Sequence, residues 1–386
     1  MNLFDQTVIL ELFRQHYLLF ILAVFAGAAG LTYYLIPKVL WVSKEKNLTA
    51  GVNSRSSHKE EVPSFGGVAF YMTIILILAL IQSLRLSFVG NHLIAAITIL
   101  FMVGLKDDLV VSTARVKLFG QVAATCFVIF SPEMHLTNLY GFLEIYEIPD
   151  VLGFMITGII VVALINAYNL IDGIDGLAGF VGIVISVVYT IVFYSTGNPF
   201  YVLLSISVAG VLSAYLRYNF ARCHKKIFMG DSGSLIIGLI LAFLTVKYLA
   251  MEPYLPLIKD GYTPNNRPLF LLCVLFIPIF DTLRVIIIRI FRGDSPFSAD
   301  RNHAHHVLLD LGFSHFKASL LLIFLNILIL GVYYYFSNKL LHEWLGFMII
   351  FFYGLAFLLF QKLKSITRNS VAKSQSNQVI ENKVNS

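Results

Sequence analysis

Long apolar segments follow one another through the whole chain, and they constrain its fold more than any other feature. Of the 386 residues, 58% are hydrophobic and 13% are charged, whereas soluble domains have roughly 45–50% apolar and about 25% charged residues. A membrane-spanning helix needs about 20 consecutive apolar residues, because its backbone groups must be hydrogen-bonded within the segment. We therefore predict an all-α polytopic membrane protein that has no soluble domain.

The predicted membrane domain forms a single unit over residues 1–364. About eleven transmembrane helices are predicted, at residues 17–37, 66–84, 87–105, 116–131, 151–169, 177–195, 200–216, 234–250, 268–290, 318–337 and 342–361. The fourth is the weakest because its apolar run is short, and the ninth contains Asp281 and Arg284, which are expected to form an ion pair. Residues 365–386 are polar, and we expect this tail to be disordered.

Basic residues determine the expected orientation, since cytoplasmic loops carry an excess of Lys and Arg. The chain has 28 Lys and Arg against 22 Asp and Glu. When the N-terminus is placed outside, most of the basic residues fall in cytoplasmic loops and in the C-terminal tail. The fourth helix is needed to keep this alternation. We predict an outside N-terminus and a cytoplasmic C-terminus, and we attribute the basic excess to topology and anionic lipid, with no nucleic acid partner.

Acidic residues gather at the predicted cytoplasmic helix ends, beginning with Asp107 and Asp108 after the third helix. Two adjacent carboxylates at a membrane surface repel each other, and a metal ion, a basic partner or a shared proton would stabilise them. The alternative is a solvated acid pair that Lys106 balances. The outer loops contain no comparable group of acids, so the polar chemistry is predicted to lie on one side of the membrane.

A second polar segment joins the fifth and sixth predicted helices, and it contains Asn166, Asn169, Asp172 and Asp175. Its two Asp-Gly steps are typical of tight turns. Two carboxylates and two amides provide oxygen ligands suited to Mg²⁺, or to hydrogen bonds with a base and a ribose. A plain connection between helices seldom needs so many acids beside lipid, so a binding role is favoured.

Residues 228–234, with the sequence Phe-Met-Gly-Asp-Ser-Gly-Ser, open the eighth predicted helix. Ser232 or Ser234 can cap this helix. The free N–H groups and the positive end of the helix dipole would then suit a phosphate. Asp231 is expected to bind a metal ion, since a carboxylate would repel bare phosphate. The alternative is an ordinary capped helix with an acid in its first turn.

Histidines cluster after the ninth predicted helix, where His303, His305 and His306 accompany Arg301. Such a cluster suits a pyrophosphate. Zinc is the alternative ligand, although no cysteine lies near in the sequence and the acids elsewhere suit Mg²⁺. A transporter is the main alternative for the whole chain, but transporters keep polar groups near the bilayer midplane on interrupted helices. The one-sided placement of the acids favours an enzyme.

Taken together, these segments resemble the polyprenyl-phosphate N-acetylhexosamine-1-phosphate transferase family. The matching segments lie in family order along most of the chain: NSRSSHKEEVPSFGG (53–67), GLKDDL (104–109), ARVKLFGQ (114–121), NAYNLIDGIDGLAG (166–179), FMGDSGSLIIG (228–238) and PIFDTLRVIIIRIFRGDSPFSADRNHAHH (278–306). The family includes the phospho-MurNAc-pentapeptide transferase of peptidoglycan synthesis, but the Arg-x-His-x-His-His pattern is closer to the GlcNAc-1-phosphate branch. The chain departs from common members because Lys106 precedes the acid pair and no third acid follows it.

The resemblance implies a reaction and a set of residue roles. A UDP-N-acetylhexosamine would give its sugar-1-phosphate, by default GlcNAc-1-phosphate, to undecaprenyl phosphate and release UMP, with Mg²⁺ as the cofactor and Mn²⁺ as a substitute. Asp231 and Asn169 would be metal ligands. Catalytic roles are implied for Asp107, Asp108, Asp172, Asp175 and His303. Substrate-binding roles are implied for Asn166, Asp172, Asp175, Arg301, His303, His305, His306, Arg55 and His58.

The resemblance also implies a place and a chemistry. The enzyme would lie in the inner membrane of a bacterium, with its active site toward the cytoplasm, and a homodimer is left open. Since an anionic phosphate oxygen attacks one phosphoanhydride and forms another, we expect a reversible reaction whose main barrier is the approach of two anions. The phospho-MurNAc-pentapeptide transferase and, with less support, a transporter remain the alternatives.

Overall fold

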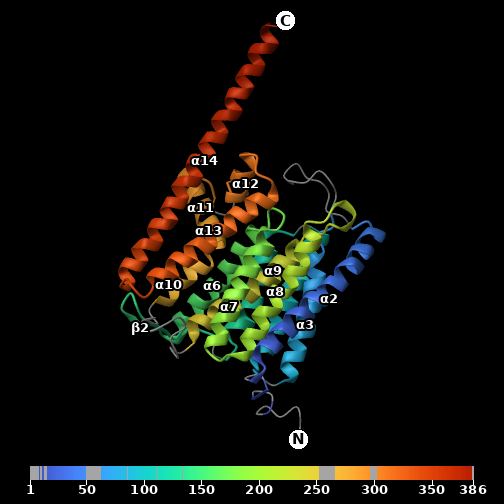
Figure 1. The fold of residues 1–386 in the computed structure, drawn as a ribbon, viewed down its shortest axis with the longest axis vertical. Helices are drawn as coiled ribbons and strands as arrows, with labels where there is room; N and C mark the ends of the chain where they lie inside the picture. Colours follow the sequence, from blue (N-terminus) through green and yellow to red (C-terminus); the bar gives the residue numbers. More distant parts are fainter. Residues whose placement is uncertain are drawn as a thin grey trace.

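The protein is seen in a computed structural model that describes residues 15–48, 62–84, 86–110, 112–132, 134–251, 266–295 and 302–384, together with Val8, Glu11 and Leu12. For residues 368–384 and for Cys223, only the backbone is described. Helices dominate these ranges (Figure 1), and the one sheet within them is a two-stranded hairpin. The predicted all-α membrane architecture is confirmed, apart from this small hairpin.

The helices have the following bounds: α2 (Tyr17–Glu45), α3 (Gly66–Ser83), α4 (Val89–Leu109), α5 (Ala114–Ile129), α6 (Asp150–Leu170), α7 (Leu177–Ser195), α8 (Pro199–Asn219), α9 (Gly230–Ala250), α10 (Arg267–Val274), α11 (Phe276–Arg292), α12 (Ala304–Asp310), α13 (His315–Phe336) and α14 (His342–Val384). A short 3-10 helix covers Cys223–Lys225. The strands β1 (Asn138–Phe142) and β2 (Ile145–Glu147) pair antiparallel between α5 and α6.

The membrane-spanning helices largely match the predicted ones. Among the described residues, nine helices are long and apolar enough to cross a membrane, and the bent pair α10–α11 raises this number to ten. The predicted number was about eleven, and α5, with 16 residues, accounts for the difference. Its length lies just below the roughly 17–25 residues of a typical transmembrane helix.

The ninth predicted helix is broken, so the prediction of one continuous span over 268–290 was wrong. α10 and α11 meet at an angle of 82°. Pro278 has no N–H and cannot bond the carbonyl of Val274. Asn326 of α13 inserts its amide at the break, where it accepts from the N–H of Ile277 at 3.1 Å and donates to the carbonyls of Cys273 and Val274 at 3.3 Å each. This insertion satisfies the backbone groups that the bend exposes.

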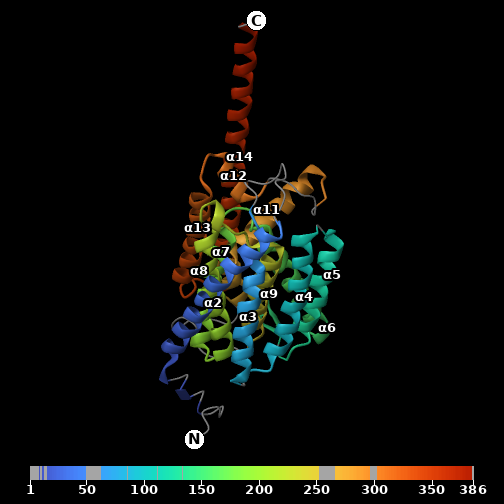
Figure 2. The same ribbon diagram turned by 90° about the vertical axis from the view of Figure 1, so that its right-hand side faces the viewer.

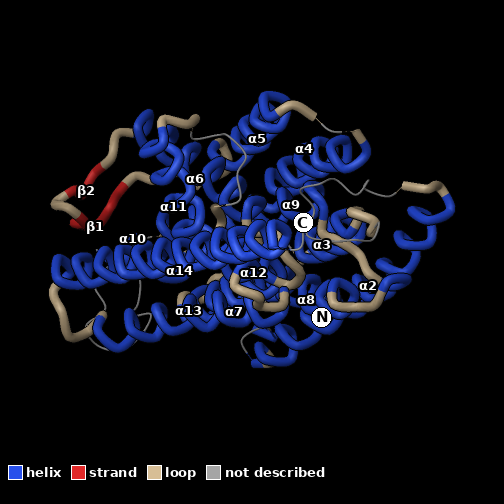
Figure 3. Tube along the Cα trace, turned by 90° about the horizontal axis from the view of Figure 1, so that it is seen from above, coloured by secondary structure: helices blue, strands red, loops and turns tan. Residues whose placement is uncertain are grey.

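α9 occupies the centre of the bundle, where it packs against α3, α4 and α6 (Figures 2 and 3). Two glycines allow its first turn to come close to the neighbouring helices. A Cβ atom on Gly67 of α3 would lie 2.2 Å from the nitrogen of Gly233, and one on Gly104 of α4 would lie 2.4 Å from the Cα of Ser232. Both contacts are with backbone, which cannot move aside as a side chain can. The first turn of α9 is therefore held between α3 and α4.

α14 extends beyond the bundle at the end where α12 lies (Figure 1). Its apolar, membrane-compatible part is His342–Thr367, and the helical backbone continues to Val384. The disorder expected for residues 365–386 stays a prediction.

Candidate functional site

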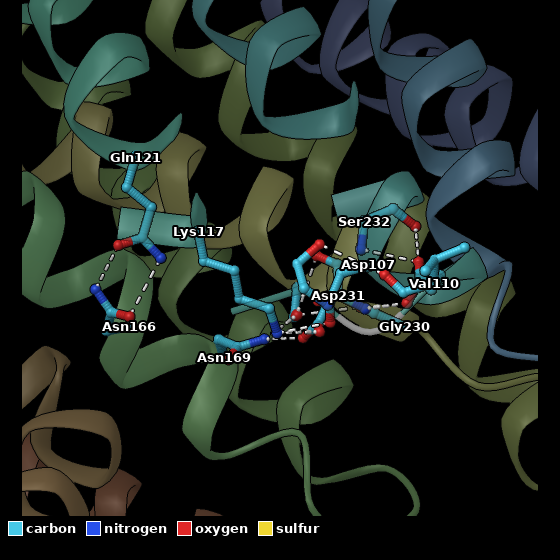
Figure 4. Close-up of polar contacts among 12 residues, drawn as sticks. Asp107, Val110, Lys117, Gln121, Asn166, Asn169, Gly230, Asp231 and Ser232 are labelled. Atoms are coloured by element: carbon cyan, nitrogen blue, oxygen red, sulfur yellow. Dashed lines mark hydrogen bonds and ion pairs between the residues drawn. The ribbon is translucent and has the colours of Figure 1, made fainter. Parts of the chain in front are cut away.

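Four helix ends meet at one end of the bundle and carry the acidic residues singled out in the sequence. These are the C-terminal ends of α4 and α6 and the N-terminal ends of α5 and α9. Figure 4 shows Asp107, Lys117, Asn169 and Asp231 pointing toward one another from these four helices. The prediction that residues far apart in the sequence gather on one side of the membrane domain is confirmed for this group.

The ammonium group of Lys117 lies between two carboxylates. Its Nζ is 2.7 Å from Oδ2 of Asp107 and 2.6 Å from Oδ2 of Asp231. On the other side of Asp231, the amide of Asn169 donates to Oδ1 at 2.7 Å and also to the hydroxyl of Ser234 at 2.7 Å. One cation therefore balances two acids that would otherwise repel each other. No role was predicted for Lys117 from the sequence, although it lies within the ARVKLFGQ segment.

Asp108 caps α9 from a neighbouring helix. Its Oδ1 accepts from the N–H of Asp231 at 2.7 Å, and its Oδ2 accepts from the N–H of Ser232 at 3.0 Å and from the hydroxyl of Ser232 at 2.6 Å. The expectation that Ser232 or Ser234 caps this helix was therefore wrong, and two of the N–H groups expected to be free for a phosphate, those of Asp231 and Ser232, are bonded to Asp108. A carboxylate at a helix N-terminus satisfies the free donors and interacts favourably with the dipole.

The turn before α9 is fixed by backbone contacts with the start of α3. The N–H groups of Gly66 and Gly67 donate to the carbonyls of Phe228 and Met229 at 3.0 and 2.9 Å. Gly230 has a φ of +72°, a conformation in which a side chain is strained. A Cβ there would also lie 2.0 Å from the carbonyl oxygen of Ser64. These backbone contacts therefore hold the segments around residues 64–67 and 228–231 against each other.

Asp172 and Asp175 lie in the turn between α6 and α7. Burial raises the pKa of Asp172 well above its usual range, and the negative charges of Asp231, Asp108 and Asp175 raise it further. Asp175 faces basic partners instead: its Oδ2 is 2.6 Å from Nζ of Lys226. Asp172 therefore lies near three other carboxylates, those of Asp108, Asp175 and Asp231.

The histidine segment lies against the same turn. The rings of His305 and His306 are 4.3 Å apart between centroids, and the ring of His303 stacks on that of His305 at 5.5 Å. A Cβ on Gly173 would lie 2.3 Å from Nε2 of His305, so this ring closely approaches the Asp-Gly turn. Burial lowers the pKa of His305 to about 3, and neighbouring histidines contribute to this shift. His305 is therefore a neutral ring near neutral pH.

Arg55, His58 and Arg301 fall outside the described residues. Asn166 forms a reciprocal amide pair with Gln121, with distances of 2.7 and 3.2 Å (Figure 4). A substrate contact through Asn166 stays a prediction, since both groups of its amide are already bonded to Gln121.

The acidic cluster fits a hard divalent cation by the chemistry of its donors. Two carboxylates, from Asp107 and Asp231, face one cation, Lys117, and the amide of Asn169 adjoins them. Oxygen ligands of this kind suit Mg²⁺. Within the described ranges, no three His, Cys, Asp or Glu side chains are already arranged around one metal position. Because the Lys117 ammonium lies between the two carboxylates, a metal ion that bound there would displace it.

Comparisons with known proteins agree on one family. Residues 91–249 match the model of glycosyl transferase family 4. The chain is 30% identical over 318 residues to the decaprenyl-phosphate N-acetylglucosaminephosphotransferase of Mycolicibacterium smegmatis, covering 76% of this chain and 77% of the relative. It is 28% identical over 332 residues to the undecaprenyl-phosphate alpha-N-acetylglucosaminyl 1-phosphate transferase of Escherichia coli O157:H7, covering 83% and 84%. The transferase of that name from Salmonella typhi is 28% identical over 285 residues, covering 72% and 74%.

Proposed function

Because the chain belongs to glycosyl transferase family 4, among the polyprenyl-phosphate N-acetylhexosamine-1-phosphate transferases, we propose that it transfers N-acetylglucosamine-1-phosphate from UDP-N-acetylglucosamine to a polyprenyl phosphate and releases UMP. The names of the relatives favour this donor over UDP-MurNAc-pentapeptide. The observation that carries the proposal is the convergence of Asp107, Asn169 and Asp231 on the ammonium of Lys117 at one end of the bundle.

The proposal includes a topology. We place the N-terminus outside and the acidic cluster at the cytoplasmic face of a bacterial inner membrane, because the basic loops adjoin the cluster. In this arrangement α5 crosses the bilayer as an eleventh span between α4 and α6, and undecaprenyl phosphate reaches the cluster from the lipid.

Different residues are proposed to act on the two anionic substrates. The nucleophile is a phosphate oxygen of the lipid, which is already anionic and needs little help from a base. Bound Mg²⁺, or Mn²⁺ in its place, would supply positive charge, with Asp231, Asn169 and Asp107 as the residues that hold it. Lys117, released from the two carboxylates, supplies a second cation for a phosphate oxygen. Asp108 takes a structural part, since its oxygens are occupied by the first turn of α9.

The donor is proposed to bind beside the histidine segment and the turn that follows α6. His303, His305 and His306 lie beside this turn, and Asp172 and Asp175 project from the turn itself. The lipid phosphate oxygen forms a new bond to the β-phosphorus of the donor while the bond to the UMP oxygen breaks. One phosphoanhydride replaces another, so the reaction is expected to run in both directions.

A transfer assay tests the proposal. Purified protein in detergent is mixed with undecaprenyl phosphate, radiolabelled UDP-N-acetylglucosamine and Mg²⁺, and label in the lipid phase is measured. Asp231→Asn is expected to lower the initial rate by about 10²–10³-fold. The matched control is Asp150→Asn, because Asp150 is exposed at the start of α6, away from the cluster.

Each outcome has a distinct meaning. Label that enters lipid, needs the divalent cation and returns to UDP-sugar when UMP is added supports the transferase. Label transferred only from UDP-MurNAc-pentapeptide would identify the peptidoglycan enzyme instead. If no UDP-N-acetylhexosamine donor gave labelled lipid, the transferase proposal would be wrong and transport would become the better hypothesis.

A further inference from the structure

A buried carboxylate lies outside the acidic cluster. Asp281 lies on α11 and is only 2% exposed. A charged side chain at such a position is costly unless it is paired and hydrogen-bonded. The transfer reaction as proposed above makes no use of Asp281, so its partners indicate what it does.

Both oxygens of Asp281 bind the start of the histidine segment. Oδ2 lies 2.7 Å from Nδ1 of His303, and Oδ1 accepts from the N–H of Ala304 at 2.6 Å. A carboxylate can only accept here, so Nδ1 of His303 carries the hydrogen. This pair of contacts fixes both the ring and the backbone at the N-cap of α12.

Asn302, the residue before His303, is held by side chains of α11 and α14. Arg284, one turn after Asp281 on α11, donates to the carbonyl oxygen of Asn302, and Lys364 of α14 donates to the side-chain oxygen of Asn302. Asn302 and His303 are both buried. The entry to the histidine segment is therefore anchored to two membrane helices.

The second nitrogen of His303 is left for another partner. Among the described residues, the His303 ring makes its hydrogen bond through Nδ1, and Nε2 makes none. The ring stacks on His305, which in turn adjoins Gly173 of the turn after α6. An Asp–His pair of this kind sets which nitrogen carries the hydrogen and how the ring is oriented.

We propose that Asp281 is a positioning residue for donor binding: it holds Nδ1–H of His303 and the N–H of Ala304, and so presents Nε2 of His303 to the pyrophosphate of the UDP-sugar. This inference rests on the proposed function. In the complex, the ring is the imidazolium cation, which lies between the Asp281 carboxylate and an anionic phosphate oxygen and donates one hydrogen bond from each ring nitrogen. Asp281 itself touches neither substrate.

Kinetics and histidine NMR test this role together. Asp281→Asn keeps the volume but places an amide N–H against either the ring N–H or the N–H of Ala304, so one of the two contacts is lost. The expected result is a rise of about tenfold in the KM for the UDP-sugar, from the loss of one charged hydrogen bond, with the KM for undecaprenyl phosphate unchanged. The matched control is Thr282→Val, because the hydroxyl of the adjacent Thr282 has no hydrogen-bond partner among the described residues.

The NMR measurement gives a readout that a purely structural role would not produce. In protein labelled with ¹⁵N-histidine, the His303 resonance is assigned by its loss in His303→Gln. Wild type is expected to show a single tautomer with the hydrogen on Nδ1, and Asp281→Asn a mixture. Unchanged tautomers, or an equal rise in both KM values, would overturn the proposal.

A second variant covers the case in which Asp281→Asn does not fold. His303→Asn keeps a donor near the Nδ1 position for Asp281 but has no counterpart of Nε2. It is expected to fold and to raise the UDP-sugar KM; a wild-type KM would overturn the proposal. If wild-type protein transferred no label, the proposed function would fail, whereas the tautomer comparison would still decide whether Asp281 orients His303.

Discussion

Gly104→Ala is predicted to inactivate the enzyme by separating two helices rather than by removing a functional group. The added Cβ would lie 2.4 Å from the Cα and 2.6 Å from the nitrogen of Ser232. Ordinary contact begins at 3.4 Å, so α4 and α9 must move apart by about 1 Å. The atoms in the way are backbone, and no rotamer change relieves the contact.

The size of the effect follows from the three hydrogen bonds of Asp108. Their lengths are 2.6, 2.7 and 3.0 Å, and a displacement of about 1 Å places each near or beyond the limit of a hydrogen bond. Asp231 moves with its helix, away from Asp107 and Lys117 on the other side. A misplacement of about 1 Å costs on the order of 10²-fold in rate, or about 2.7 kcal/mol of barrier. Overpacking is expected to destabilise the fold by about 1–3 kcal/mol as well.

The assay is the initial rate of lipid labelling, normalised to the monodisperse protein recovered from size-exclusion chromatography. Gly331→Ala is the matched control, because a Cβ on this helical glycine of α13 would meet nothing within 4 Å. The control should keep the wild-type rate. A folded Gly104→Ala protein that transfers label within about threefold of wild type would refute the argument that the α4–α9 contact positions the acidic cluster.

Two further predictions concern charge. Lys117→Met removes the ammonium that competes with Mg²⁺ for Asp107 and Asp231. The Mg²⁺ concentration at half-maximal rate should therefore fall about fivefold, equivalent to about 1 kcal/mol for a partly exposed pair. A Mg²⁺ titration checks this prediction, and a higher requirement for Mg²⁺ would contradict it. His305 binds its proton near pH 6.5 when unfolded but only near pH 3 when folded, so it destabilises the fold as pH falls below 6.5, by at most about 1.4 kcal/mol per pH unit. Thermal unfolding at pH 7 and pH 5 should therefore show a smaller loss of stability for His305→Gln than for wild type, and equal losses would show that burial of His305 has no such effect.

The membrane helices and the acidic residues of the cluster could be predicted because their signals are local. Apolar runs long enough to cross a bilayer have few other uses, and Asp107, Asn169 and Asp231 stand out where a helix meets the interface. Once the runs alternate across the membrane, these residues must fall on one side. These residues could therefore be placed on one face from the sequence, although the contacts among them could not.

The contacts within that face could not be predicted, because they depend on side chains from distant segments. The sequence indicated Ser232 or Ser234 as the cap for α9, but the cap is Asp108, more than a hundred residues earlier. The bend between α10 and α11 depends on Asn326, which inserts from α13. Pro278 was a local signal for this bend, yet proline is tolerated in many transmembrane helices, so it does not specify a break by itself.

The central position of α9 has a consequence for how the protein is made. Almost every residue of α9 is buried, and its closest neighbours α3, α4 and α6 are all synthesised before it. These earlier helices are made first, so the space at their centre must stay open or reopen to admit one more helix. A chain that stops before Gly230 would therefore lack the centre of the bundle, and the cluster would be assembled only when the first turn of α9 enters between Gly67 and Gly104.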